Sequence, residues 1–345
     1  MNNIKNIGDK TLKKWIEDDK YRKNLAIKAD QIRREVYGDK VFVRGLIEFS
    51  NICKNSCYYC GIRAENTKVK RYRLSVDEII QRARFGYDLG FRTFVLQGGE
   101  DIGFRDDDFI KIIKDIKDLY SDVAITLSLG VRSKESYKKL FEAGADRYLL
   151  RQETSDKDHY RALHPESMGF EQRRRALWDL KEIGFQVGGG FMVDSPYQTT
   201  EMIIKDIRFL QELNPAMIGI GPFLSSKNTP FSSFPNGSYT KTLRLISILR
   251  ILFPKALIPA TTALGTIRPQ GREEGLKAGA NVLMPNLSPK DVRGAYSLYD
   301  NKLYTGTESA EERDLLSEKI EKIGYRLAVD RGDVISYNKK TRRYD

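Results

Sequence analysis

The stretch VFVRGLIEFSNICKNSCYYC, residues 41–60, joins an apolar run rich in β-forming residues to a loop with three cysteines. Cys53, Cys57 and Cys60 are the only cysteines of the 345-residue chain. Three thiolates on one short loop can each bind one iron of a four-iron, four-sulfur cluster, which normally takes four cysteine ligands. The spacing therefore predicts a [4Fe–4S] cluster with one iron open to a substrate or cofactor.

Other interpretations of these cysteines exist. A structural zinc needs four ligands, and the two histidines, His159 and His164, lie about a hundred residues downstream. A cysteine can also be an ordinary core residue, because a thiol behaves as a small apolar group. A disulfide would leave one cysteine over, and the N-terminal sequence MNNIKNIGDKTLKKW has no secretory signal. The zinc and core alternatives remain open, and the cysteine usage predicts a reducing, cytoplasmic location.

The composition predicts a soluble protein with a large core. Hydrophobic residues make up 40% of the chain and charged residues 31%, and no stretch approaches the roughly 18 apolar residues that span a membrane. The formal charge is +12, but Lys and Arg mostly alternate with Asp and Glu, as in DDDFIKIIKDIKDL. Two basic runs remain, at 68–73 and 339–343, and neither belongs to a nucleic-acid-binding module. We therefore expect neither membrane nor nucleic-acid binding, but an anionic substrate or an acidic partner.

Apolar, β-rich runs alternate with amphipathic segments along the chain. After a charged helical segment at 10–37, eight such runs occur, at 41–49, 93–97, 123–129, 147–151, 186–193, 217–221, 257–262 and 282–285. The segments between them, such as VDEIIQRARFGYDLGF and EMIIKDIRFLQELNP, have apolar residues at helical spacing. Three of these helices end in a glycine before the next strand, as in DLGFRTFVLQ, EAGADRYLL and KAGANVLMP.

This alternation predicts an α/β fold with a parallel sheet, and eight repeats favour a single-domain, closed (β/α)8 barrel. A doubly wound open sheet is the alternative. No linker rich in Pro, Gly or Ser divides the chain. We predict a helical lead-in at 1–40, the barrel at 41–300 and, at 301–345, a C-terminal extension that packs on the barrel. The active site of such a barrel lies at the carboxyl ends of its strands.

Several predicted strand ends carry candidate ligand groups. Gly98 and Gly99, in LQGGED, let the backbone approach a ligand closely, although Gly-Gly is also a common turn. Arg151 and Glu153, in RYLLRQET, are two residues apart, so on an extended strand they point the same way. Opposite charges on an inward face need each other or a ligand, so a salt bridge and a ligand site explain them equally well.

The later segments add further candidates. Thr261 and Thr262 offer two hydroxyls at the seventh strand end, suited to an anion, with helix capping as the alternative. Arg173, in FEQRRRALWDL, begins a helix and would on that ground alone be an exposed surface arginine.

Taken together, these segments resemble the radical S-adenosylmethionine (SAM) enzymes. The spacing CxxxCxxC with Tyr59 before Cys60 is similar to the cysteine loop of that family, and LQGGED is similar to its GGE segment. From about residue 33 to residue 299 the chain resembles the branch that holds the HydE family of [FeFe]-hydrogenase maturases, methylornithine synthase and biotin synthase. The segments that carry this resemblance are IEFSNICKNSCYYCGIRAEN, KRYR, TLSLG, GADRYLLRQET, MIGIGPF, IPATTALGTI and GANVLMPN.

The resemblance implies a radical SAM barrel in which the three cysteines hold the cluster and the open iron binds the amino and carboxylate groups of SAM. It implies reductive cleavage of SAM to a 5′-deoxyadenosyl radical. The implied SAM contacts are Tyr59, Gly98, Gly99, Glu100, Ser128, Glu153 and Arg173. The implied contacts to an anionic substrate are Thr126, Arg151, Thr261, Thr262, Tyr296 and Tyr299.

The HydE branch further implies assembly of the two-iron subcluster of the hydrogenase H-cluster. Its substrate would be an iron–carbonyl–cyanide–cysteine complex, its partners the maturases HydG and HydF, and its reductant a ferredoxin or flavodoxin. A methylornithine synthase-like mutase acting on an amino acid is one alternative. It is disfavoured for lysine because the later strand ends lack an acidic residue for the distal ammonium. Biotin synthase is disfavoured because its second cluster requires additional cysteines.

A non-catalytic iron–sulfur or zinc carrier is the alternative from another class. A carrier needs the cysteine loop but not the GGE segment, Glu153 and Arg173, so their joint presence favours an enzyme.

The chain also departs from the family pattern. Tyr197, in VDSPYQT, stands where the family usually has glycine, and Ile102 follows GED where proline is common. The C-terminal cysteines that hold a second cluster in some HydE proteins are missing, so that accessory site cannot form here.

Overall fold

The computed structural model describes residues 7–344, and residues 1–6 of the predicted lead-in lie outside that range. The central sheet has six parallel strands in the order β2-β3-β4-β5-β6-β8. These strands are Gly45–Ser50, Thr93–Gly98, Ala124–Ser128, Arg147–Leu149, Gln186–Gly189 and Met217–Ile218. Each strand pairs with the next one of the set along the chain, as repeated strand–helix units require.

The sheet closes on itself through residues 257–259 and strand β10 (Val282–Leu283). The closing contacts are three parallel bridges, Met217 with Leu257, Pro259 with Val282, and Leu46 with Asn286. They bring the eighth segment back beside the first, so the central sheet has no open edge there. The closed eight-stranded barrel is therefore confirmed, and the open-sheet alternative is wrong.

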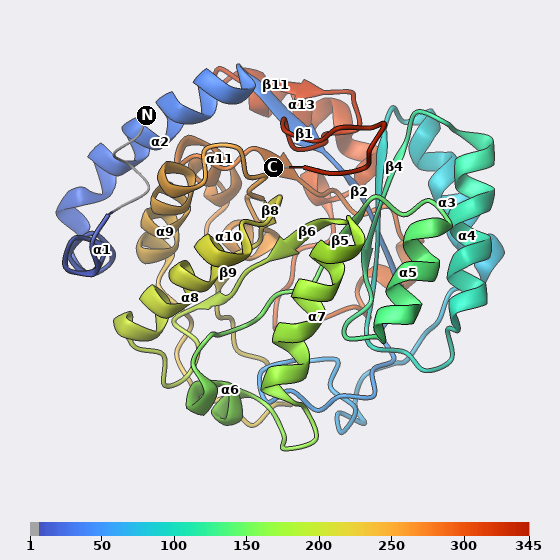
Figure 1. The fold of residues 1–345 in the computed structure, drawn as a ribbon, viewed down its shortest axis with the longest axis horizontal. Helices are drawn as coiled ribbons and strands as arrows, with labels where there is room; N and C mark the ends of the chain where they lie inside the picture. Colours follow the sequence, from blue (N-terminus) through green and yellow to red (C-terminus); the bar gives the residue numbers. More distant parts are fainter. Residues whose placement is uncertain (1–6, 345) are drawn as a thin grey trace.

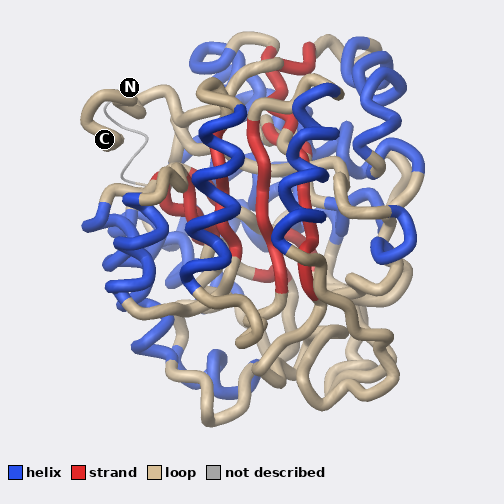
Figure 2. Tube along the Cα trace, turned by 90° about the vertical axis from the view of Figure 1, so that its right-hand side faces the viewer, coloured by secondary structure: helices blue, strands red, loops and turns tan. Residues whose placement is uncertain are grey.

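Helices form the outer layer around the strands (Figure 1). The larger ones are α3 (Val76–Asp88), α4 (Asp106–Leu119), α5 (Lys134–Glu142), α7 (Phe170–Ile183), α8 (Thr200–Leu213), α9 (Tyr239–Leu252) and α13 (Arg313–Glu321). The shorter helices are α6 (Lys157–Leu163), α10 (Thr262–Ile267), α11 (Gly271–Lys277) and α12 (Lys290–Arg293). Figure 2 shows the strands at the centre and long loops gathered below them, where the strands end.

The predicted helical lead-in consists of two helices, α1 (Asp9–Glu17) and α2 (Arg22–Tyr37), joined by a 3-10 turn. Arg244 of α9 donates a hydrogen bond to the carbonyl of Ile16 (2.7 Å) and pairs with Asp19. Because this guanidinium is buried against the junction of the two helices, the lead-in is attached to the outer layer of the barrel.

Several predicted strands are shorter or divided. The run 41–49 consists of β1 (Lys40–Val43) and β2, and β1 pairs with β10 on one side and with β11 (Arg326–Ala328) on the other. The fifth and sixth runs continue after a break as β7 (Met192–Val193) and β9 (Gly221–Pro222). The first break falls at Gly190, whose φ is 147° and where a Cβ would lie 1.9 Å from the carbonyl of Gly219. Glycine therefore interrupts the strand so that two backbones can meet.

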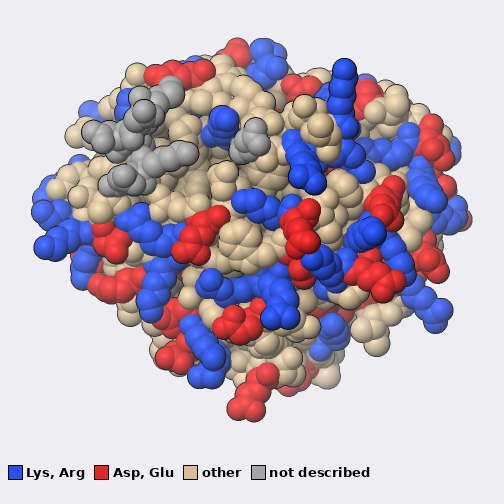
Figure 3. Space-filling model, viewed as in Figure 1, with Lys and Arg blue, Asp and Glu red and all other residues tan. Residues whose placement is uncertain are grey.

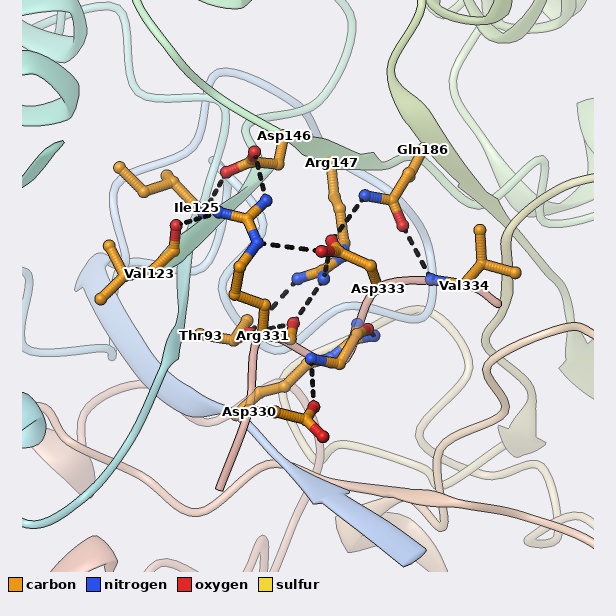
Figure 4. Close-up of polar contacts among 12 residues, drawn as sticks. Thr93, Val123, Ile125, Asp146, Arg147, Gln186, Asp330, Arg331, Asp333 and Val334 are labelled. Atoms are coloured by element: carbon orange, nitrogen blue, oxygen red, sulfur yellow. Dashed lines mark hydrogen bonds and ion pairs between the residues drawn. The ribbon is translucent and has the colours of Figure 1, made fainter. Parts of the chain in front are cut away.

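The C-terminal segment contacts the amino-terminal ends of central strands, because Thr93, Arg147 and Gln186, the first residues of β3, β5 and β6, bond to residues 331–334 (Figure 4). Arg147, the first residue of β5, donates to the carbonyl of Arg331 (2.5 Å) and to the carboxylate of Asp333 (2.6 Å). Gln186, the first residue of β6, donates to the same carboxylate (2.8 Å). Arg331 in turn pairs with Asp146 (2.8 Å). These contacts close the base of the barrel, so its open end is the carboxyl end of the strands.

Charges of both signs alternate over the surface seen in Figure 3. Several adjacent pairs lie one helical turn apart, such as Lys111 with Asp115. This mixture agrees with the predicted solvated helix faces. In the part of the chain that the structure describes, no helix is both long and apolar enough to cross a bilayer.

Candidate active site at the barrel mouth

The three cysteines lie on the loop after β2, and all three are free and half-buried. Arg71 organises this loop. Its guanidinium donates to the carbonyls of Asn51 (2.6 Å), Ile62 (2.9 Å), Arg63 (2.6 Å) and Asn66 (3.0 Å). Because one side chain satisfies four carbonyls that flank the cysteines, the protein itself sets the shape of the loop.

The environment of the thiols suits a metal cluster. Burial raises the pKa of all three thiols, for Cys60 to about 12, and neighbouring thiols add to this effect at Cys57. The sulfur of Cys53 accepts the N–H groups of Asn55 and Glu100, each at 3.4 Å. Such thiols become thiolates when a metal centre replaces the proton. Within residues 7–344, no group of three His, Cys, Asp or Glu side chains is placed to hold a single metal ion.

The Gly-Gly segment packs directly on the cysteine loop. Gly98 is the last residue of β3, and the N–H of Gly99 donates to the carbonyl of Ser50 (3.0 Å). A Cβ on Gly99 would lie 2.2 Å from the carbonyl of Ile52 and 2.8 Å from the Cβ of Cys53. Only glycine allows this approach, which explains the segment better than a plain turn does. The carboxylate of Glu100 accepts the N–H of Val131 (3.2 Å), so the third strand end joins the same cluster of loops.

Arg151, Glu153 and Arg173 meet at the mouth. Arg151 donates to the carboxylate of Glu153 (2.6 Å), and a guanidinium nitrogen of Arg173 lies 4.0 Å from that carboxylate. The Nε of Arg173 donates to the carbonyl of Arg151 (2.7 Å). The side chain of Arg173 is only 11% exposed, so the alternative of an exposed surface arginine is wrong.

The reason predicted for the Arg151–Glu153 contact is also wrong. β5 ends at Leu149, and Glu153 has a φ of 66°, so the two residues do not lie on one extended strand. A residue other than glycine in this region costs about 1–3 kcal/mol and is typical of functional sites. The turn, rather than the alternation of a strand, brings the two charges together.

The chain is similar to several known proteins. The sequence profile of the Radical SAM superfamily matches residues 47–210. The chain is 46% identical over 288 residues to the [FeFe] hydrogenase maturase subunit HydE of Thermotoga maritima, which covers 84% of this chain and 82% of that protein. The chain belongs to the radical SAM superfamily. It is an enzyme of the type that uses a [4Fe–4S] cluster and SAM, and it holds the corresponding cysteines at 53, 57 and 60.

Other radical SAM proteins are also similar. The chain is 31% identical to 3-methylornithine synthase of Methanosarcina acetivorans, over 87% of this chain and 82% of that protein. The crystal structure of methylornithine synthase (PylB) superimposes with a TM-score of 0.82 at 28% identity, covering 93% of this chain and 94% of that one. A structure of the maturase HydG gives a TM-score of 0.78 at 23% identity, covering 95% and 74%, and shows the shared fold alone.

Among the residues that the resemblance implied for the substrate, two threonines are prominent. The hydroxyls of Thr126, on β4, and Thr261 are buried and have no hydrogen-bond partner in the described structure. Thr261 precedes α10, but its side chain makes no capping bond, so the capping alternative is wrong for it. Thr262 donates to the buried carboxylate of Glu308 (2.8 Å). Ser128, the last residue of β4, is half-buried.

Sequence reasoning missed a buried ion pair beside the two predicted tyrosines. Lys302 donates to the carboxylate of Glu48 (2.6 Å), and both side chains are at most 10% exposed. Tyr296 lies beside this pair, and burial, together with the charge of Glu48, raises the pKa of its phenol. Tyr299 is three residues further on, and burial raises its pKa as well. The one signal in the sequence was Glu48 itself, a charge within the apolar run GLIEFS.

The two departures from the family pattern lie at the surface. Ile102 is 81% exposed. Tyr197 is 62% exposed, and its φ of 67° lies in the region that favours glycine, the residue that the family usually has there. The ring of Tyr197 packs edge to face on Phe234, with centroids 5.3 Å apart. Both side chains therefore flank the site without entering the barrel.

Proposed function

We propose that this radical SAM enzyme is a maturase that assembles the two-iron subcluster of the [FeFe]-hydrogenase H-cluster. The observation that carries the proposal is the 46% identity to a HydE protein over 84% of this chain. The complete set of groups at the mouth supports it, because the cysteine loop, the Gly-Gly turn and the Arg151–Glu153–Arg173 cluster lie together. A carrier that only delivers metal would need the first of these groups alone.

In this proposal Cys53, Cys57 and Cys60 hold the cluster. When bound, the cluster and SAM supply reductive cleavage of the sulfonium carbon–sulfur bond to a 5′-deoxyadenosyl radical. The chain positions SAM through Tyr59, the carbonyls of the Gly98–Gly99 turn, Glu100 and Ser128, and through two charged side chains. Glu153 accepts a hydrogen bond from SAM, and Arg173 is the buried cation available to an anionic group. The closed base of the barrel excludes water from below.

The proposed substrate is a small anion, an iron–carbonyl–cyanide–cysteine complex. The unpartnered hydroxyls of Thr126 and Thr261 can donate to it, and Arg151 has a buried Nε with no partner. Thr262, Tyr296 and Tyr299 complete the proposed contacts. The partners that follow are HydG and HydF, and a ferredoxin or flavodoxin as reductant. The same proposal includes a cytoplasmic location and the division of the chain into a lead-in (1–40), a barrel (41–300) and a C-terminal extension (301–345).

The second candidate is a methylornithine synthase-like mutase, which the 31% identity and the TM-score of 0.82 support. Lysine as a substrate would need an acidic partner for its distal ammonium. Besides Glu153, which pairs with Arg151, two buried acids lie beside proposed substrate contacts, Glu48 next to Tyr296 and Glu308 next to Thr262, but each already has its own cation. Glu48 is bound to Lys302, and Glu308 is bound to Arg272. The charge arrangement therefore favours the anionic substrate.

The test is in vitro maturation of [FeFe]-hydrogenase with the other maturases, using anaerobically purified protein with four irons per cluster. We expect hydrogenase activity, and no conversion of lysine to methylornithine. The Cys60→Ser protein is the control and should give neither product. Methylornithine formation without hydrogenase activity would contradict the maturase role and leave the radical SAM assignment intact.

A further inference from the structure

Tyr59 is held by a histidine from far along the chain. Its hydroxyl lies 3.0 Å from Nε2 of His164, 105 residues away, and the two rings meet edge to face with centroids 5.4 Å apart. His164 is only 2% exposed. In the sequence, both histidines lie about a hundred residues from the cysteine loop. The fold places one of them, His164, against Tyr59, which directly precedes the cluster ligand Cys60.

The contacts of the His164 ring determine its tautomer. Nδ1 lies 3.0 Å from the carbonyl oxygen of Tyr160, which can only accept, so Nδ1 carries the proton. Nε2 of the neutral ring is then an acceptor, and the Tyr59 hydroxyl donates to it. The His164 ring also stacks on the ring of Tyr160, with centroids 4.1 Å apart. His164 is therefore an acceptor of fixed position and orientation.

The short helix that ends just before His164 is bonded to the cysteine loop. α6 begins after Asp156, three residues beyond Glu153, and the carboxylate of Asp156 accepts the N–H of His159 (3.0 Å). At the other end, the N–H of Tyr58 donates to the carbonyl of Leu163 (3.0 Å). The backbone of the cysteine loop and the Tyr59 side chain thus depend on the same short helix.

We propose that His164 is a positioning residue for SAM, which holds the Tyr59 ring in one orientation beside Cys60. An aromatic ring held in this way offers a flat apolar surface to the adenine of SAM. A side chain that is free before binding must be ordered by the ligand, and this ordering lowers the affinity. With the hydroxyl bound to His164, the ring is ordered in advance. The inference rests on the proposed place of Tyr59 in the SAM site.

The experiment measures the dissociation constant of SAM by equilibrium dialysis against the cluster-loaded protein, together with iron content and thermal unfolding. His164→Phe keeps a ring on Tyr160 but removes the acceptor, and we expect about three- to tenfold weaker SAM binding with iron retained. His164→Gln restores an acceptor and should recover most of the affinity. Tyr59→Phe should weaken binding similarly, and the double variant should bind no worse than either single one, because the two groups act through one bond.

The chain offers a matched control in His159, which lies on this short helix, is equally buried and bonds to the carbonyl of Pro196 (3.0 Å). His159→Phe should lower the unfolding temperature without changing the affinity for SAM. Equal SAM affinity in His164→Phe and the wild type, or an equal loss in His159→Phe, would overturn the inference. If the His164→Phe protein loses its cluster, the SAM affinity of Tyr59→Phe is the deciding measurement. A wild-type SAM affinity in Tyr59→Phe would overturn the inference. A wild-type protein that binds no SAM would overturn the proposed function as well.

Discussion

Replacing Asp333 by alanine tests whether the C-terminal segment is an integral part of the barrel base. The carboxylate of Asp333 accepts hydrogen bonds from Arg147 (2.6 Å), Gln186 (2.8 Å) and Arg331 (2.9 Å) (Figure 4). Burial would raise the pKa of Asp333, but Arg147 and Arg331 hold it below its usual value. The carboxylate is therefore ionised at neutral pH and offsets the charge of Arg147. The buried Arg44 adds a further positive charge nearby.

The expected loss follows from burial. The side chain of Arg147 is 0% exposed and that of Asp333 is 12% exposed, so solvent screens their interaction little. Removing one partner of a buried ion pair costs about 3–5 kcal/mol. Arg147 keeps two bonds, to the carbonyl of Arg331 (2.5 Å) and to the hydroxyl of Thr93 (3.3 Å), which reduces the penalty. We therefore expect Asp333→Ala to lower the free energy of unfolding by about 3 kcal/mol.

The assay is urea unfolding of the cluster-loaded protein, followed by circular dichroism. Asp330→Ala is the matched control. Asp330 pairs with Lys40 at 3.4 Å, with both side chains more than 40% exposed, and accepts the N–H of Gly332 (2.7 Å), so its loss should be about 1 kcal/mol. Since the pKa of Asp333 is lowered by folding, its contribution is present above the unfolded pKa and is lost as pH falls through the folded pKa. The difference between Asp333→Ala and the wild type should thus shrink below about pH 4. Equal losses in Asp333→Ala and Asp330→Ala would refute this reasoning.

Further predictions concern the site and its support. Serine in place of any one of the three cysteines should abolish SAM cleavage, because an alcohol is a much poorer iron ligand than a thiolate; full 5′-deoxyadenosine production by any such variant would contradict the cluster assignment. Glu153→Ala should weaken SAM binding by about 1.5–3 kcal/mol, whereas unchanged affinity with lower stability would leave Glu153 only its salt bridge with Arg151. Burial raises the pKa of Asp206 to about 8, so this carboxyl is protonated in the folded protein and ionised in the unfolded chain between about pH 4 and pH 8. Stability should fall as pH rises through that range, and Asp206→Asn should remove up to about 1.4 kcal/mol per pH unit of this dependence; an unchanged slope in urea titrations would argue against it.

The sequence by itself determined the cluster ligands and the class of fold. The three cysteines lie within eight residues, so their proximity needs no tertiary structure. Helix ends are also local. Gly90, Gly144 and Gly279 all have the positive φ expected of glycines that end helices. Strand and helix periods repeat along the chain, and eight repeats favour a barrel over an open sheet, while the bridges of the folded chain show that the barrel is closed.

Only the tertiary structure decided how charged and polar side chains are partnered. The pairs Tyr59–His164, Glu48–Lys302 and Arg147–Asp333 join residues 105, 254 and 186 positions apart. Local periodicity predicts whether a side chain faces inward, but it does not predict which distant group forms its hydrogen bond or ion pair. The left-handed turn at Glu153 could not be predicted from the sequence either, because surrounding contacts, rather than the local preference of glutamate, hold the strained backbone. A buried charge is stable only when it is paired, and the partner is a residue that the tertiary structure brings close.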